Sequence, residues 1–296
     1  GVIAALSAFI KALTQPGDKV LIQTPVYNHF FTSIHNSGCQ AAESPLVYRD
    51  NTYTIDFDDL ERKAADPAVK LMLLCNPHNP AGRVWTPAEL HRIGELCLRH
   101  DVVVVADEIH CELVMPGFRY TPFASLCEEF ERRSVTCTSP SKAFNLAGLQ
   151  VANIFAADAA LRARIGHSLQ INETGEIGPF AIEALIAAYD EGAEWLDALN
   201  EYLHGNYRFL REYFDRNLPQ YPVLPLEGTY LVWVDCRASG LTSDELETKL
   251  LEEAKLRINP GSIYGEAGRD FIRLNIACPR KLLAEGLDRL RKVLKR

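Results

Sequence analysis

Apolar positions in about the first 180 residues form short runs that alternate with amphipathic stretches. The run Val102–Ala106 shows no alternation, which predicts a strand covered on both faces, as in a parallel sheet. The repeated strand-then-helix order favours an α/β domain with a mostly parallel sheet. Strands are expected at Val20–Gln23, Leu71–Cys75, Val102–Ala106, Val135–Thr138 and Asn153–Ala156, and helices at Val2–Leu13 and near His29–Asn36.

A further helix is predicted to begin at Thr86. The four residues T-P-A-E that start there form a capping box with proline at the first helical position. Leu90, Ile93 and Cys97 then recur at the spacing of one buried helix face.

The pattern changes after about residue 180. Pro179–Leu218 is predicted to be mostly helical, with a break near Gly192. We therefore expect two domains, a cofactor-binding large domain over residues 1–192 and a connecting helix with a smaller α+β domain over residues 193–296. In this second part strands are expected at Tyr230–Val234 and Phe271–Asn275, and helices at Ser243–Ala254 and Lys281–Leu294.

The composition is that of an ordinary globular protein. Of 296 residues, 47% are hydrophobic and 24% are charged, and the net charge of -8 argues against nucleic acid or an anionic membrane as a partner. No apolar run approaches the roughly 20 residues of a membrane span. The eight cysteines include no C-x-x-C pair, which favours reduced, buried thiols in a cytoplasmic protein.

Two polar turns that follow predicted strands carry the candidate chemistry. Lys142 lies in the segment S-P-S-K-A-F-N after Val135–Thr138, and Asp107 begins the segment D-E-I-H after Val102–Ala106. In open parallel sheets, ligands bind at the carboxyl ends of the strands, so both side chains are expected at one site. Pyridoxal 5'-phosphate (PLP) requires such a pair. The lysine amine forms a Schiff base with the cofactor, and the carboxylate keeps the pyridinium nitrogen protonated.

Two other interpretations of these turns are weaker. The segment that ends in Lys142 also fits S-x-x-K, the nucleophile motif of penicillin-binding proteins and β-lactamases, but the chain contains neither S-D-N nor K-T-G. Glu108, His110, Cys111 and Glu112 include possible metal ligands, but no second cluster completes a metal site, and we expect none.

Over nearly its whole length the sequence resembles the PLP-dependent class I/II aminotransferase family, and within it the MalY/PatB branch of cystathionine β-lyases (C–S lyases). The resemblance is carried by D-E-I-H, N-P-H-N-P-A-G, P-S-K-A-F-N and L-N-I-A-C-P. It implies the PLP-dependent transferase-like fold, fold-type I, with a large α/β domain and a smaller C-terminal α+β domain.

The resemblance also implies roles for individual residues. Lys142, Asp107 and Tyr27 are the implied catalytic residues, with Tyr27 lying over the PLP ring. Arg273 clamps the substrate α-carboxylate. Asn79 donates to the phenolate oxygen of PLP and also borders the substrate. The remaining cofactor contacts are expected from His110, which stands where the wider family has tyrosine, and from Ser139, Ser141, Gly1, Val2 and Ile3 near the phosphate. The position at which broader members have a phosphate-binding arginine is Gln150 here, so main-chain amides and hydroxyls are expected to hold the phosphate.

The implied activity is β-elimination on L-cysteine thioethers, which releases a thiol, pyruvate and ammonia. Two alternatives stay open. One is a class I/II aminotransferase with the same cofactor, and the other is a regulatory protein that keeps the fold and contacts a transcription factor. The resemblance further implies a homodimer with a small amino-acid substrate. Since family members carry several dozen residues before Gly1, we expect this chain to lack an N-terminal arm.

Overall fold

The computed structural model describes residues 1–295, and its larger sheet has six strands. Neighbouring strands run parallel except at one edge, where β7 and β8 are antiparallel. This confirms the α/β class with a mostly parallel sheet. The strand order is β2 (Gln40–Glu43), β1 (Lys19–Ile22), β5 (Val69–Cys75), β6 (Val103–Asp107), β7 (Ser134–Thr138) and β8 (Asn153–Phe155).

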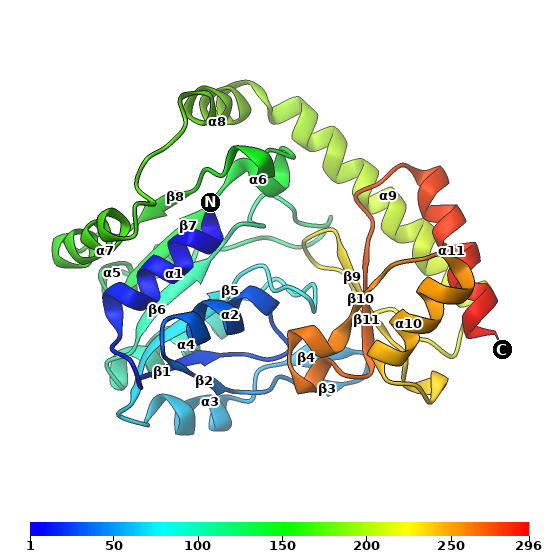
Figure 1. The fold of residues 1–296 in the computed structure, drawn as a ribbon, viewed down its shortest axis with the longest axis horizontal. Helices are drawn as coiled ribbons and strands as arrows, with labels where there is room; N and C mark the ends of the chain where they lie inside the picture. Colours follow the sequence, from blue (N-terminus) through cyan, green and yellow to red (C-terminus); the bar gives the residue numbers. More distant parts are fainter. Residues whose placement is uncertain (296) are drawn as a thin grey trace.

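Helices cover both faces of this sheet, as Figure 1 shows. In β5, alternate residues face opposite cores. Leu71 and Leu73 pack against the helices on one face of the sheet, and Met72 and Leu74 pack against the helices on the other face. The absence of alternation in the sequence therefore reflects two buried faces. The helices on the Leu71 face are α1 (Val2–Leu13), α2 (Asn28–Asn36) and α7 (Ala159–Ile171). The helices on the Met72 face are α3 (Phe57–Ala64), α4 (Pro87–Arg99) and α5 (Glu128–Arg132).

The capping box predicted at Thr86 is confirmed. The Thr86 hydroxyl accepts from the Glu89 main-chain N–H, and the Glu89 carboxylate accepts from the Thr86 N–H at 2.8 Å. Among the elements of this half that the sequence analysis did not predict are β2, α3, α5, α7 and the hairpin of β3 (Val47–Arg49) and β4 (Thr52–Thr54).

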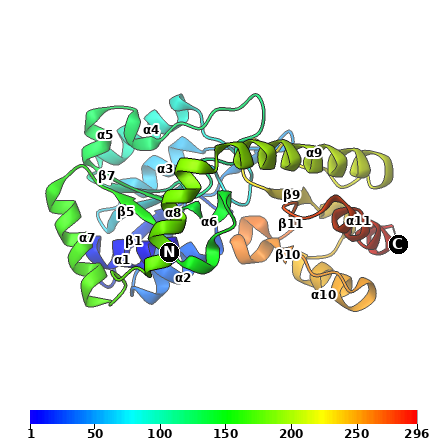
Figure 2. The same cartoon turned by 90° about the horizontal axis from the view of Figure 1, so that it is seen from above.

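The predicted helical break at Gly192 is also confirmed. The residue separates α8 (Pro179–Glu191) from α9 (Ala193–Asn217). Figures 1 and 2 show α9 as the long helix that leads from α8 to the second sheet. A short helix, α6 (Pro140–Ala143), lies beneath this joint and carries Lys142.

The C-terminal part contains a three-stranded antiparallel sheet in the order β10 (Asn259–Pro260), β11 (Phe271–Asn275) and β9 (Leu231–Asp235). Two helices, α10 (Ser243–Ala254) and α11 (Arg280–Leu294), pack on it around a core of their own. All four predicted elements of this part are present, and the boundary expected between residues 192 and 193 stays a prediction.

Aromatic side chains join the β3–β4 hairpin to the smaller sheet. The ring of Phe271 stacks on Trp233 at 5.4 Å, and Tyr48 meets Phe271 edge-on at 5.1 Å. The Tyr48 hydroxyl donates to Asp235 at 3.1 Å. These contacts hold the β3–β4 hairpin against β9 and β11.

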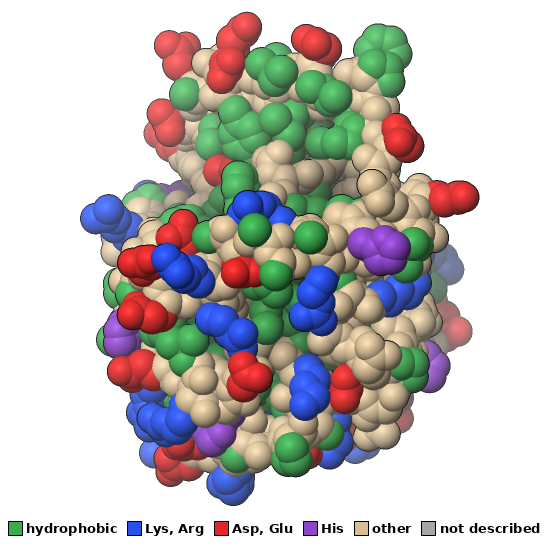
Figure 3. All heavy atoms as spheres, turned by 90° about the vertical axis from the view of Figure 1, so that its left-hand side faces the viewer, with side chains coloured by type: hydrophobic (Ala, Val, Ile, Leu, Met, Phe, Trp, Pro, Cys, Tyr) green, Lys and Arg blue, Asp and Glu red, His purple; other side chains and the backbone are tan. Residues whose placement is uncertain are grey.

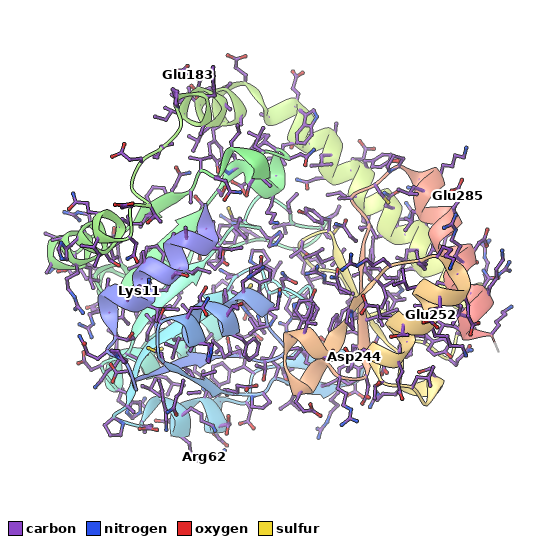
Figure 4. All side chains as sticks on the ribbon, viewed as in Figure 1. Lys11, Arg62, Glu183, Asp244, Glu252 and Glu285 are labelled. Carbon is purple, nitrogen blue, oxygen red and sulfur yellow. The ribbon has the colours of Figure 1, made fainter. Side chains whose placement is uncertain are left out.

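The surface carries charges of both signs and one apolar region. Figure 4 shows charged side chains such as Arg62, Glu183 and Glu285 projecting from the helices. In Figure 3, hydrophobic side chains gather in the upper part of the face, at the level of α8 in Figure 1. We call Ile177, Phe180, Ile182 and Ile186 the α8 patch; Phe180 is 81% exposed.

All eight cysteines are free thiols, and five of them are buried. In the part of the chain that the structure describes, we find no helix long and apolar enough to cross a membrane.

Candidate active site

A cavity of about 270 Å³ opens where several strands of the larger sheet end. Loops that follow the carboxyl ends of β1, β5, β6 and β7 form one side, the start of α1 contributes to it, and β11 of the smaller sheet closes the other. This is the position at which open α/β sheets bind ligands. The lining residues are Gly1, Val2, Ile3, Tyr27, Cys75, Asn79, Asp107, Ile109, His110, Ser141, Lys142, Ala147, Gln150, Val151, Tyr230, Leu231, Arg273 and Asn275.

Asp107 is the last residue of β6 and is almost fully buried. Its register partners are Cys75 on β5 and Cys137 on β7, two buried thiols. The carboxylate accepts a hydrogen bond from the main-chain N–H of Ile109 at 3.2 Å. Burial raises the pKa of Asp107 from 3.8 to about 7, opposed by that hydrogen bond and by the charge of Lys142. A cationic group beside this carboxyl would lower its pKa and stabilise the ionised form, as the charge of Lys142 already does in part.

Lys142 projects into the cavity from α6 because the turn before it is tightly held. Ser139 caps α6: its hydroxyl accepts from the Ser141 N–H at 3.2 Å and donates to the Val151 carbonyl at 2.7 Å. Burial lowers the pKa of Lys142, and the charge of Arg273 lowers it further, whereas Asp107 raises it. A depressed amine pKa increases the neutral, nucleophilic fraction near neutral pH.

Arg273 reaches the cavity from the middle of β11. Its guanidinium donates to Asn79 Oδ1 at 3.1 Å and to Asn259 Oδ1 at 3.0 Å, and it lies 5.0 Å from the centre of the Tyr264 ring. Its buried Nε has no hydrogen-bond partner within residues 1–295, and no carboxylate there forms an ion pair with it. Burial lowers its pKa. Such a guanidinium is suited to a carboxylate that arrives with a ligand.

Aromatic and imidazole side chains line the rest of the cavity. Tyr27 caps the start of α2, and burial raises its pKa to about 12, so the phenol stays neutral. Burial lowers the pKa of His110 to about 3, which keeps the imidazole neutral as well. The rings of His110 and Tyr230 meet edge-on at 5.8 Å.

The cavity also has a side suited to an anion. Gly1 caps α1, and Val2 and Ile3 place the first turn of that helix at the cavity, where free N–H groups and the helix dipole favour negative charge. Ser141 lines the same cavity. Gln150 lines it too, with its side-chain amide donating to the Ala147 carbonyl at 2.9 Å.

These residues fit PLP. One cavity brings together a lysine amine, a buried carboxyl with no side-chain hydrogen bond, an aromatic ring and the amino end of a helix. Lys142 makes no hydrogen bond or ion pair in the described part of the chain. Each of these groups matches a different part of the cofactor: the aldehyde, the ring nitrogen, the ring face and the phosphate.

The structure brings together every predicted site residue except Ser139, whose hydroxyl is used to hold the turn of Lys142. His78 is buried and contacts the Pro25 carbonyl through Nε2 at 2.8 Å, so it is part of the loop structure and does not line the cavity. Among residues 1–295 no cluster of three or more potential metal ligands is present.

Sequence reasoning assigned no role to several lining residues, among them Cys75 and Tyr230. Because Cys75 is the last residue of a predicted strand, its position could have indicated that it lines the site. Ile109, Ala147 and Asn275 carry no chemical signature and are found only from the structure.

Comparison with known proteins identifies close relatives. A profile of the family described as Aminotransferase class I and II matches residues 1–290. The chain is 44% identical to Cystathionine beta-lyase PatB of Bacillus subtilis, over 99% of this chain and 76% of that protein. It is 35% identical to Protein MalY of Escherichia coli, over 97% of this chain and 73% of that protein.

Solved structures agree with these sequence relatives. Cystalysin from Treponema denticola, which contains a pyridoxal 5'-phosphate cofactor, superposes with a TM-score of 0.98 at 37% identity, over 100% of this chain and 75% of that one. The PLP-bound C–S lyase from Staphylococcus hominis gives a TM-score of 0.93 at 32% identity, over 100% of this chain and 75% of that one.

Proposed function

The chain belongs to the aminotransferase class I and II family, and we propose that it is a PLP-dependent carbon–sulfur β-lyase of the cystathionine β-lyase type. The enzyme cleaves L-cysteine thioethers to a thiol, pyruvate and ammonia. The observation that carries the proposal is the single cavity shared by Lys142, Asp107 and Arg273, in a chain 44% identical to a cystathionine β-lyase.

Arg273 binds and orients the substrate. Its guanidinium already donates to two amide oxygens and keeps Nε free, so a substrate α-carboxylate is the charged partner that it lacks. Asn79, held 3.1 Å away, fixes the direction from which that carboxylate approaches. The Cα–H bond is thereby presented to the lysine side of the cavity.

Lys142 moves the proton at Cα. Its amine would hold the aldehyde of the cofactor, and as a free neutral base it would take the proton from Cα of the substrate. The depressed pKa keeps a neutral amine available for this role. A positioned base of this kind contributes about 10²–10⁴-fold to the rate.

Asp107 supplies the charge that makes the cofactor effective. The chemistry that PLP supplies when bound is a sink for the electron pair left at Cα, which then expels the thiol from Cβ. As a carboxylate, Asp107 would hold the proton on the ring nitrogen. Tyr27 would contact the ring face, and Asn79 and His110 would contact the phenolate oxygen. A cationic partner beside Asp107 would lower its raised pKa and stabilise the ionised form.

The products distinguish this proposal from an aminotransferase. We expect PLP-loaded protein to release thiol and pyruvate from L-cystathionine in equal amounts without any 2-oxo acid. An aminotransferase instead needs a 2-oxo acid acceptor and converts it to an amino acid. If turnover depended on added 2-oxoglutarate and no free thiol formed, the aminotransferase function would replace the lyase.

The small-molecule partner is an amino-acid substrate, and we infer a homodimer as the assembly. The support is the α8 patch, four exposed apolar side chains at and just before α8. We place the enzyme in the cytoplasm, a reducing compartment that suits eight free thiols.

A further inference from the structure

A largely buried ion pair joins two loops that border the cavity. Arg83 Nε donates to Glu227 Oε2 at 2.9 Å, and the same oxygen accepts from the Val84 main-chain N–H at 2.8 Å. The two side chains are only 12% and 13% exposed. They are separated by 144 residues in the chain, so the pair connects the loop after β5 with the loop before β9.

Main-chain hydrogen bonds fix the same two loops to each other. The N–H groups of Glu227 and Gly228 both donate to the Gly82 carbonyl, at 2.9 and 3.1 Å. Thr229 N–H donates to the Leu113 carbonyl at 2.7 Å, which adds the segment after β6. A Cβ on Gly82, where φ is +70°, would approach Leu226 Cδ1 to 2.8 Å, so the loops pack too closely for a larger residue.

The remaining donors of Arg83 are also satisfied. Nη2 donates to both carboxylate oxygens of Glu89 at 3.2 Å, and Nη1 donates to the Tyr53 carbonyl. Arg83 therefore holds the first turn of α4, the β3–β4 hairpin and the Glu227 loop at once. A guanidinium can do this because its donors form a rigid, planar fork, whereas an ammonium cannot.

Each loop delivers one side chain to the cavity. Asn79 lies four residues before Arg83 and accepts from Arg273 at 3.1 Å. Tyr230 lies three residues after Glu227, borders the cavity and meets His110. A shift of either loop would move a neighbour of the Arg273 guanidinium, even though neither Arg83 nor Glu227 lines the cavity.

We propose that Arg83 and Glu227 are positioning residues that set the geometry of the substrate-carboxylate site around Arg273. The proposal rests on the proposed function, since it concerns binding of the amino-acid substrate. Without the pair, Asn79 and Tyr230 lose their fixed distance from Arg273, and the carboxylate binds less well.

The test compares E227A, E227Q and R83K with the parental protein, all loaded with PLP. E227A removes the hydrogen bonds that the Glu227 carboxylate accepts from Arg83 and from the Val84 N–H. R83K keeps the positive charge but loses the planar set of guanidinium donors. E227Q keeps the size of the side chain and one acceptor oxygen. We expect KM for L-cystathionine to rise on the order of 10- to 100-fold in E227A and R83K, with kcat changing far less and E227Q intermediate. The control is E128A, which removes an exposed ion pair with Arg132 on α5 and should leave KM unchanged.

A second measurement needs no turnover. Glycine has the amine and the carboxylate but no Cβ and therefore no group to eliminate, so the absorbance change of bound PLP on glycine titration reports binding without elimination. We expect the glycine Kd to rise in parallel with KM in E227A, E227Q and R83K. If folded R83K and E227Q had the same KM and the same glycine Kd as the parental protein, the pair would only stabilise the fold, even if the melting temperatures of these variants were lower. Absence of thiol release by the parental protein would contradict the proposed function instead.

Discussion

At the residue scale, a substitution of Arg273 can separate the effect of its positive charge from the effect of its planar geometry. Arg273→Lys keeps a positive charge on β11 but removes the planar donor pair that matches a carboxylate. Losing one charge-assisted hydrogen bond of about 1.5–3 kcal/mol corresponds to roughly a 10- to 100-fold higher KM for L-cystathionine. Steady-state kinetics measure this directly, with Arg269→Lys, in an exposed pair with Glu266, as the control. An unchanged KM would remove Arg273 from the carboxylate site.

Asp107 gives a pH-dependent prediction for the cofactor-free protein. Its folded-state pKa of about 7 lies above the unfolded value of 3.8, so protonation of Asp107 stabilises the fold. This contribution is fully present below about pH 4 and is lost as the pH rises through 7. The amide introduced by Asp107→Asn does not titrate and stays neutral throughout. The stability of Asp107→Asn relative to the parental protein should therefore increase by about 2–3 kcal/mol between pH 5 and pH 8.

Denaturant unfolding of both proteins without PLP at the two pH values measures this difference. The control is Asp101→Asn, whose side chain is 89% exposed and should show no such trend. With PLP bound, the parental protein should gain stability relative to Asp107→Asn, because the cation at the ring nitrogen favours the ionised Asp107. A pH-independent difference between Asp107→Asn and the parental protein in the absence of PLP would contradict a raised pKa.

At the element scale, the joint between α8 and α9 supports α6. A Cβ on Gly192 would lie 2.5 Å from Phe144 Cε1 and would also collide with the Ala188 carbonyl oxygen. Phe144 follows Lys142 by two residues, stacks on Trp195 at 5.8 Å and meets Tyr189 edge-on at 5.7 Å. Gly192→Ala should therefore destabilise the protein by about 1–3 kcal/mol and lower its lyase activity.

The matched control for this change is Gly166→Ala in α7. No atom lies within 4 Å of a Cβ built there, so alanine should stabilise that helix by about 0.5–1 kcal/mol without affecting activity. Thermal unfolding and kcat/KM of both variants test the comparison. Equal behaviour of the two alanine variants would mean that the α8–α9 joint does not support Lys142.

Element prediction from the sequence succeeded where burial leaves a strong pattern. The five apolar runs predicted as strands in the first half are strands, and the helix predicted at Lys281–Leu294 is α11, which buries Leu283, Leu287 and Leu290. The hairpin β3–β4 was missed because each strand has three residues, only partly buried, and is held by tertiary contacts such as that between Tyr48 and Asp235. Short strands of this kind have too little periodicity of their own.

Part of the candidate site could also be predicted from the sequence. Lys142 and Asp107 follow strong strands, and the family resemblance supplied Asn79, Tyr27 and Arg273. Nothing in the sequence could show that Asn79 contacts Arg273 across 194 residues, or that the Ser139 hydroxyl donates to the Val151 carbonyl and does not line the cavity. The first of these facts depends on how the two sheets are placed relative to each other, and the second depends on how the turn around Lys142 packs against the segment before β8.

At the scale of the whole molecule, the α8 patch provides a test of assembly. Phe180 is 81% exposed, a large apolar area for an isolated surface side chain. If this patch lies in a homodimer interface, Phe180→Glu should convert a dimer to a monomer in analytical ultracentrifugation. Leu282→Glu, on α11 at 58% exposure, is the matched control and should leave the mass unchanged. A parental protein that is already monomeric would contradict the homodimer.

The central claim is that the two sheets together build one PLP site on Lys142. The most direct measurement is borohydride reduction of the PLP-loaded protein, followed by mass-spectrometric mapping of the pyridoxyl group. We predict a single label on Lys142, one per chain, that abolishes thiol and pyruvate release from L-cystathionine. A label on another lysine, or a label on Lys142 with turnover intact, would contradict the account.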